Sequence, residues 1–178
     1  MKGNKTAVLF LIKFFGTYLL LFLLYSFYLE RTQNETSPYV CAPITKTVAE
    51  QTNYLLNIFG YPTEIAQDPE TLSIKLFINN KFTAFIVEGC NAISIIILFI
   101  AFIVAFAGKF KTTVLYILFG SLLIYFTNIV RIAVISVALH KYPQYQHVLH
   151  EIVFPSIIYG ITFLLWFMWI HKFSKLRK

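Results

Sequence analysis

The sequence predicts an all-α membrane protein: a bundle of four transmembrane helices, with a small extracytoplasmic helix and a β-hairpin between the first two. Of its 178 residues, 58% are hydrophobic and 13% are charged, whereas about 25% are charged in an average soluble domain. The apolar residues form blocks near the ~20 residues that a helix needs to cross a bilayer. The net charge is +7, but the basic residues cluster at the chain ends and in one loop. This pattern indicates membrane topology and no nucleic-acid partner.

Four apolar blocks give the predicted transmembrane helices. They cover residues 7–29, 92–107, 114–139 and 152–170. The first block contains Lys13 near one end, where a lysine can extend its amine to the interface. The second is short for a span, and the third contains a single charge, Arg131. A chain of this length fits one membrane-embedded domain over residues 1–178.

Basic residues predict the orientation of these helices. They lie before the first block, in the turn between the second and third blocks, and in the C-terminal tail, as Lys2, Lys5, Lys109, Lys111 and the four Lys and Arg residues of 171–178. Four helices place all three segments on one side, which the positive-inside rule makes cytoplasmic. Both termini are therefore predicted to be cytoplasmic and residues 30–89 extracytoplasmic. The first block is too long for a signal peptide, and no cleavage site follows it.

The extracytoplasmic segment has two structured parts. Residues 43–60 place apolar side chains at helical spacing before Gly60 and Pro62, which predicts a short amphipathic helix on the membrane or on the bundle. Residues 72–87 alternate around Asn79-Asn80, a pair that favours a tight turn. They predict a β-hairpin whose second strand leads to Cys90. The predicted apolar faces are Ile44, Val48, Leu55 and Phe59 in the helix, and Leu72, Ile74, Leu76 and Ile78 in the hairpin.

Three polar residues are predicted to meet near the outer membrane surface. Cys90 precedes the second block, where a helix N-terminus favours a thiolate. Arg131 lies in the third block, where a charge costs at least ~2.5–3.5 kcal/mol to insert, and Asn128 shares its helical face. His150 lies at the start of the fourth block. Because consecutive helices run in opposite directions, all three reach the same level.

This set has the parts for acyl transfer through a thiol. Cys90 is the candidate nucleophile and His150 the candidate general acid and base. Arg131 is the candidate that stabilises the oxyanion or holds the substrate. Glu88 and Asn91, together with Asn128, are expected to support the site.

The segments 88-EGCNAIS-94, 127-TNIVRIAVIS-136 and 147-HVLHEIVFPSIIYG-160 resemble motifs of the exosortase/archaeosortase family of multi-pass membrane transpeptidases. The resemblance runs over about residues 72–165. It puts the family's catalytic cysteine, arginine and histidine on Cys90, Arg131 and His150, and the asparagine before the arginine on Asn128. With four predicted helices, the chain looks like a short member of the exosortase F kind.

The resemblance also implies substrates and a location. The substrates would be secreted proteins that end in a short motif, a transmembrane helix and a basic tail. The acyl group would pass to an acceptor, for which a membrane lipid or a glycan is a candidate. The enzyme would lie in the bacterial cytoplasmic membrane with its active site at the extracytoplasmic face. No metal and no organic cofactor is implied.

Two other classes of function stay open. His147, His150 and Cys90 have residue types and spacing that suit a zinc or copper site. The chain could also be a non-catalytic assembly subunit or a small transporter in which Arg131 pairs with Glu88 or Glu151. A disulfide between Cys41 and Cys90 would favour the non-catalytic interpretation, because an oxidised cysteine cannot attack a carbonyl.

Overall fold

A computed structural model of the protein describes residues 2–33, 40–68, 70–106 and 108–173. Each apolar block forms a helix, because a helix satisfies its own backbone hydrogen bonds where water is absent. Within the described ranges, the side chains of residues 2–4, 6, 150, 151 and 154 lie outside the description. The four helices are α1 (Lys2–Thr32), α3 (Ile93–Ala105), α4 (Phe110–Lys141) and α6 (Phe154–Lys172).

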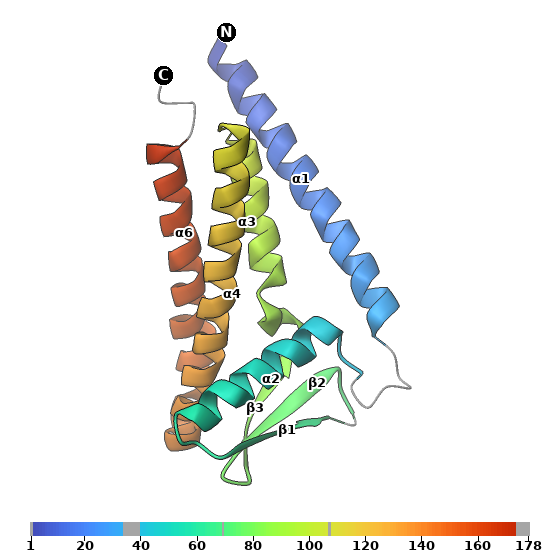
Figure 1. Ribbon diagram of the computed structural model, residues 1–178, viewed down its shortest axis with the longest axis vertical. Coiled ribbons are helices and arrows are strands. Elements are labelled where there is room, and N and C mark those ends of the chain that lie inside the picture. The colour runs from blue at the N-terminus through green and yellow to red at the C-terminus, as the bar shows by residue number, and fades with distance from the viewer. Residues whose placement is uncertain (1, 34–39, 69, 107, 174–178) are drawn as a thin grey trace.

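Two of these helices are long and apolar enough to cross a membrane. Among the described residues these helices cover Ala7–Thr32 and Phe110–Lys141, while the apolar helix α3 is shorter. The start of α1, the connection between α3 and α4, and the end of α6 lie at one end of the molecule (Figure 1). These helices are consistent with a membrane protein. The four crossings and the cytoplasmic position of that end stay predictions.

Residues 140–151, between the third and fourth predicted helices, are largely helical and do not form a loop. The helix α4 continues to Lys141 and therefore includes His140. Short helical turns then lead into α6 with no extended loop between them. They are η2 (Pro143–Tyr145), α5 (Gln146–Val148) and the π-helical turn η3 (Leu149–Val153).

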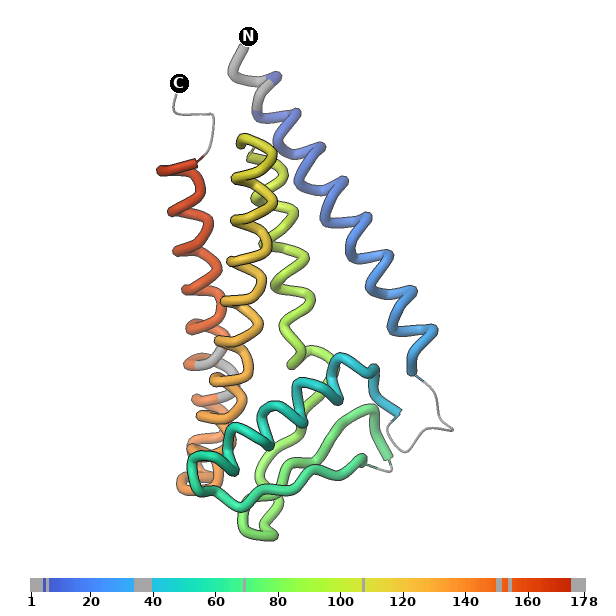
Figure 2. Tube along the Cα trace, in the orientation of Figure 1, coloured from blue at the N-terminus to red at the C-terminus, as the bar shows by residue number. Residues whose placement is uncertain are grey.

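The helix α1 diverges from α3 toward the sheet end of the molecule (Figure 2). Near its start, the Phe10 ring lies 4.5 Å from that of Phe106 and 6.2 Å from that of Phe102, centroid to centroid. Its most apolar window is not buried inside the protein. An apolar helix with this much exposed surface suits contact with lipid.

The bundle core lies between α3, α4 and α6. Two of its polar aromatic side chains donate to carbonyl oxygens, as is usual for buried indoles and phenols, whereas the buried Trp166 Nε1 has no hydrogen-bond partner among the described residues. The Trp169 indole N–H donates to the carbonyl of Phe106 at 2.9 Å, and the Tyr116 hydroxyl donates to that of Leu165 at 2.7 Å. The buried members of this core are Ala92, Phe99, Ile103, Ile124, Ile158, Leu165 and Trp169.

Close contact between α3 and α4 depends on Gly120, because a Cβ there would lie 2.3 Å from the Phe99 ring, which is fully buried. We expect Gly120→Ala to destabilise the protein by about 1–3 kcal/mol, as overpacked cores do. Thermal unfolding in detergent, followed by tryptophan fluorescence, measures the loss. Gly160→Ala is the matched control, since no atom lies within 4 Å of its added Cβ. Equal unfolding temperatures for both variants would contradict the prediction.

At the other end, helix α2 (Pro43–Ile58) lies across a three-stranded antiparallel sheet (Figure 1). We call these elements the outer module. The strands β1 (Thr63–Gln67), β2 (Ser73–Ile78) and β3 (Lys81–Val87) are in the order β1-β2-β3. Asn79 and Asn80 have φ of 52° and 59° in the turn between β2 and β3, which matches a type I′ hairpin. The hairpin prediction is confirmed, and β1 is an additional strand.

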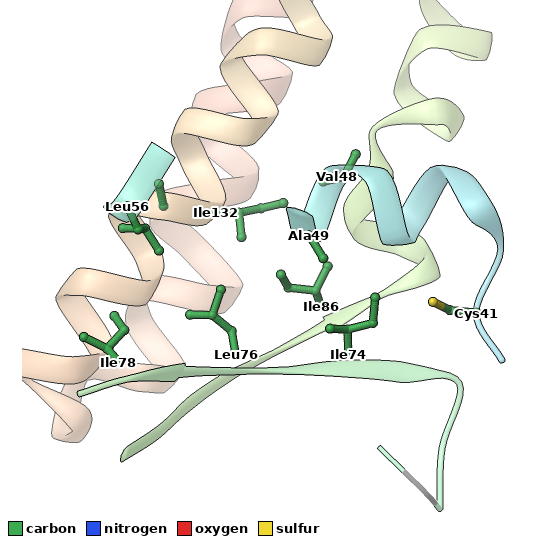
Figure 3. Close-up of a cluster of buried hydrophobic side chains, with 10 residues drawn as sticks. Cys41, Val48, Ala49, Leu56, Ile74, Leu76, Ile78, Ile86 and Ile132 are labelled. Atoms are coloured by element: carbon green, nitrogen blue, oxygen red, sulfur yellow. The ribbon is translucent and has the colours of Figure 1, made fainter. Parts of the chain in front are cut away.

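The core of the outer module lies between α2, the sheet and α4 (Figure 3). Ile74, Leu76 and Ile78 are buried as predicted. Leu72 is 45% exposed, because it lies just before the start of β2 at Ser73. Of the predicted apolar face of α2, Val48 is fully buried, whereas Phe59 follows the helix and is 71% exposed. The buried face of α2 consists of Thr45, Val48, Ala49, Thr52 and Leu56.

Candidate active site

Cys90 lies in a turn of its own between the sheet and the bundle. The chain leaves β3 at Val87, forms the 3-10 turn η1 (Glu88–Asn91), and passes through Ala92, whose φ is +65°, into α3. Cys90 therefore does not lie in the first turn of α3. The side-chain oxygen of Asn91 accepts a hydrogen bond from the Ile93 N–H at 3.0 Å. Asn91 thus satisfies the first N–H of α3, and the effect of this helix N-terminus on the Cys90 thiolate stays a prediction.

Glu88 fixes the start of the turn through its carboxylate. Its Oε1 accepts hydrogen bonds from the Ala42 N–H at 2.6 Å and from the Gln33 amide at 3.2 Å. Its Oε2 accepts a hydrogen bond from the Thr45 hydroxyl. Hydrogen bonds to a carboxylate are stronger than those between neutral groups. Glu88 therefore connects the Cys90 turn to the end of α1 and the start of α2.

Asn91 fixes the other end of the turn. Its amide nitrogen donates to the Tyr25 hydroxyl at 2.7 Å and to the Thr45 hydroxyl at 3.1 Å. Thr45 thus contacts both Glu88 and Asn91, and it is fully buried. Sequence reasoning missed Thr45, Tyr25 and Gln33. Thr45 lies three residues before the buried Val48, so a search of α2 for polar residues on its inner face would have found it.

Asn128 joins α4 to the same turn. Its amide nitrogen donates to the carbonyl of Cys90 at 2.6 Å, and its side chain is 1% exposed. Because the bond goes to the backbone of Cys90, it fixes the position of this residue and leaves its thiol free to react. Glu88, Asn91 and Asn128 thus all stabilise the turn that carries Cys90. This arrangement suits residues that position Cys90 without taking part in the chemistry.

The side chains of Cys90 and Arg131 line one cavity of about 160 Å³. Its walls come from β3 and α4, with Gln146 of α5 as a further lining residue. The Arg131 Nε is buried and, among the described residues, has no hydrogen-bond partner. A guanidinium is a permanent cation with five donors, so Arg131 retains donor capacity toward a ligand in this cavity.

Two acidic residues, Glu88 and Glu151, were predicted as alternative ion-pair partners of Arg131, and the structure describes the side chain of Glu88 only. Glu88 forms its hydrogen bonds with Gln33, Ala42 and Thr45. The ion pairs found within the described part of the chain are Lys46–Glu50 and Lys75–Asp68, and neither includes Arg131. The side chain of Glu151 lies outside the described residues. A pair with Glu88 is therefore not formed, and one with Glu151 stays open.

The side chain of His150 also lies outside the described residues. Its backbone lies in the π-helical turn η3, directly after α5. Gln146, four residues before His150, lines the cavity of Cys90 and Arg131, while His147 is exposed. Among the described residues, no three His, Cys, Asp or Glu side chains come together in a group suited to a metal.

The two cysteines have different surroundings. Both are free thiols, Cys41 buried in the core of the outer module and Cys90 half-buried. Burial, followed by the nearby Glu88 carboxylate, raises the pKa of the Cys41 thiol. A raised pKa lowers the thiolate fraction, and the thiolate is the nucleophile. Because Cys90 is half-buried and lines a cavity, it is the better placed of the two for attack on an external carbonyl.

The chain matches one protein-family model. The model describes a transmembrane exosortase (Exosortase_EpsH) and covers residues 5–169, which include the outer module, the Cys90 turn, α4 and most of α6. No curated protein and no solved structure matches the chain.

Proposed function

Since the chain belongs to the transmembrane exosortase family, we propose that it is a membrane cysteine transpeptidase that cleaves C-terminal sorting tails from secreted proteins. A membrane transpeptidase-type role follows from the family in general. The tail, the transfer to an acceptor and the residue roles are the proposal. The observation that carries it is the shared cavity of Cys90 and Arg131, which come from separate helical elements more than 40 residues apart in sequence.

The proposed reaction has two acyl transfers. The Cys90 thiolate attacks the scissile carbonyl carbon, and Arg131 donates hydrogen bonds to the developing oxyanion or to the nearby substrate. The C–N bond breaks, a thioester forms, and the amine of the released tail takes a proton from His150. An amine or hydroxyl of the acceptor, or water, then attacks the thioester and gives its proton to His150, which now acts as the base. The Cys90 thiolate leaves, and the enzyme is restored.

The arrangement of the fold supports a reaction at the outer membrane surface. Four residues of β3 line the cavity, and β3 lies at the end of the molecule opposite the start of α1 and the end of α6 (Figure 1). The basic residues predict that those ends are cytoplasmic. A tail anchored by one transmembrane helix would expose the residues before that helix at this level.

Trapping the thioester tests the proposal directly. The assay uses a tailed reporter: a secreted domain fused to a motif, transmembrane helix and basic tail from a protein of the same genome that the wild-type protein processes. We expect a covalent adduct of enzyme and reporter that hydroxylamine releases, and peptide mass spectrometry should locate it on Cys90. Processing with the adduct on Cys41, or without any thiol adduct, would contradict the proposed mechanism.

His150 is predicted to act as the general acid and base. We expect His150→Ala to lower the rate of reporter processing by about 10²–10⁴-fold, the usual contribution of such catalysis. The rate in isolated membranes, normalised to the amount of enzyme, measures the effect. His147→Ala is the matched control and should retain processing, because His147 is exposed on the preceding helical turn. A larger loss for His147→Ala than for His150→Ala would assign the role to His147.

A further inference from the structure

The strand β3 (Lys81–Val87) is an edge strand of the sheet. It pairs with β2 on one side, and among the described residues no strand pairs with its other side. An edge strand presents backbone N–H and C=O groups that another extended chain can bind. The same strand leads directly into the turn that carries Cys90.

The cavity of Cys90 and Arg131 follows this edge. Four consecutive residues of β3 line it, Phe82, Thr83, Ala84 and Phe85. Successive side chains of a strand point to opposite faces, so a cavity that touches four in a row lies along the strand's edge and not over one face. The residue pairs Phe77↔Phe82 and Leu76↔Ala84 leave Thr83 as the extra residue of a β-bulge. Such bulges are common beside active sites.

The opposite wall of the cavity is the helix α4. It contributes Ile132, Ile135, Ser136 and Leu139 in addition to Arg131. A cleft between an edge strand and a helix is a recurring site for peptides that bind as an added strand. The cavity of about 160 Å³ is smaller than the ~300 Å³ at the lower end of small-molecule sites.

We propose that the substrate segment just before the cut binds between β3 and α4 as an added strand, parallel to β3. The inference rests on the proposed function. It makes the backbone of β3 the element that recognises the substrate's main chain. The ligand is an extended peptide segment, held by main-chain hydrogen bonds and aligned so that its scissile carbonyl reaches Cys90.

The direction follows from chain order. From β3 the chain runs past Cys90 into α3, away from the sheet end of the molecule (Figure 1). A sorting tail has the same order, with the motif first, the cut next and the transmembrane helix last. Residues before the cut can thus lie beside β3 while the cut lies beside Cys90 and the helix enters the bilayer alongside the bundle. An antiparallel segment would send the substrate's helix away from the membrane.

Disulfide crosslinking tests both the position and the direction. The enzyme carries Cys41→Ala and Cys90→Ala, with one new cysteine at Phe82→Cys or Phe85→Cys on β3. These side chains are 44% and 48% exposed, so their replacement leaves the buried core intact. Ala66→Cys on β1, the other edge of the sheet, is the matched control. The probe is the tailed reporter, with a single cysteine moved through the residues before its cut, and copper phenanthroline as the oxidant.

We expect crosslinks from both β3 positions and at least tenfold less from Ala66→Cys. In a parallel arrangement, Phe82→Cys should crosslink farther from the cut than Phe85→Cys. The reverse order would overturn the parallel direction, and equal yields from both edges, or none from β3, would overturn the site. If β3 gives no crosslinks while the wild-type protein processes the reporter through Cys90, this inference fails alone. Processing that continues without Cys90 would instead refute the proposed function.

Discussion

Replacing Cys90 with alanine is expected to abolish processing of the tailed reporter, with a loss on the order of 10⁶-fold, as when a protease loses its nucleophile. No thioester can form without the sulfur, and the turn itself should persist. The carbonyl of residue 90 still accepts the hydrogen bond from Asn128, because that bond involves the backbone. Processing in membranes, with the amount of folded enzyme measured in parallel, provides the test.

Cys41→Ala is the control for this experiment. Cys41 is buried in the core of the outer module, and its thiol pKa is raised. We expect this variant to lose some stability, since it removes a buried sulfur, and to retain processing. Normal processing by Cys90→Ala would refute the thiol mechanism. Loss of processing in Cys41→Ala with the enzyme still folded would indicate that Cys41 takes part.

Replacing Arg131 is expected to have the second largest effect. Arg131→Ala should lower the processing rate by about 10²–10³-fold, the loss seen when an oxyanion donor is removed. Arg131→Lys keeps the charge but loses the planar fork of donors, so we expect it to recover only part of the rate. The rates are measured in isolated membranes at equal amounts of enzyme.

The stability of the Arg131 variants separates this role from a structural one. Arg131 Nε is buried without a partner among the described residues. If the guanidinium serves the substrate, Arg131→Met should insert and unfold near the wild-type temperature while processing is lost. If Arg131 instead pairs with Glu151 as part of a non-catalytic subunit, its removal should lower the folded yield. A low yield with an unchanged rate per folded molecule would contradict the catalytic role.

Sequence patterns predicted the features that depend on periodicity or on a single unusual residue. The Asn79-Asn80 turn and the burial of Ile74, Leu76 and Ile78 follow from alternation and turn chemistry. The charge at Arg131 stands out in an apolar helix, and helix direction was enough to expect it near Cys90. The two do line one cavity.

Features that depend on contacts between distant residues were not predictable. The strand β1 has only five residues, and its alternating buried face begins with the polar residue Thr63. The hydrophobic alternation in so short a segment is too weak to predict a strand without its partner β2. The bond between Gln33 and Glu88 joins residues 55 positions apart, and a single hydrogen bond leaves no periodic trace in the sequence. The buried face of α2 includes two threonines, whereas the prediction used only apolar residues.

The helix α4 contributes to both cores, with Ile124 in the bundle and Ile132 in the outer module. At 1.5 Å per residue, its 32 residues span about 48 Å, more than the ~30 Å of hydrocarbon in a typical bilayer. Because one continuous helix contributes to both cores, we expect the cavity of Cys90 and Arg131 to keep a constant height above the bundle. Its depth below the lipid headgroups therefore changes with membrane thickness. We therefore expect lipid chain length to change how much of the cavity between β3 and α4 is open to water.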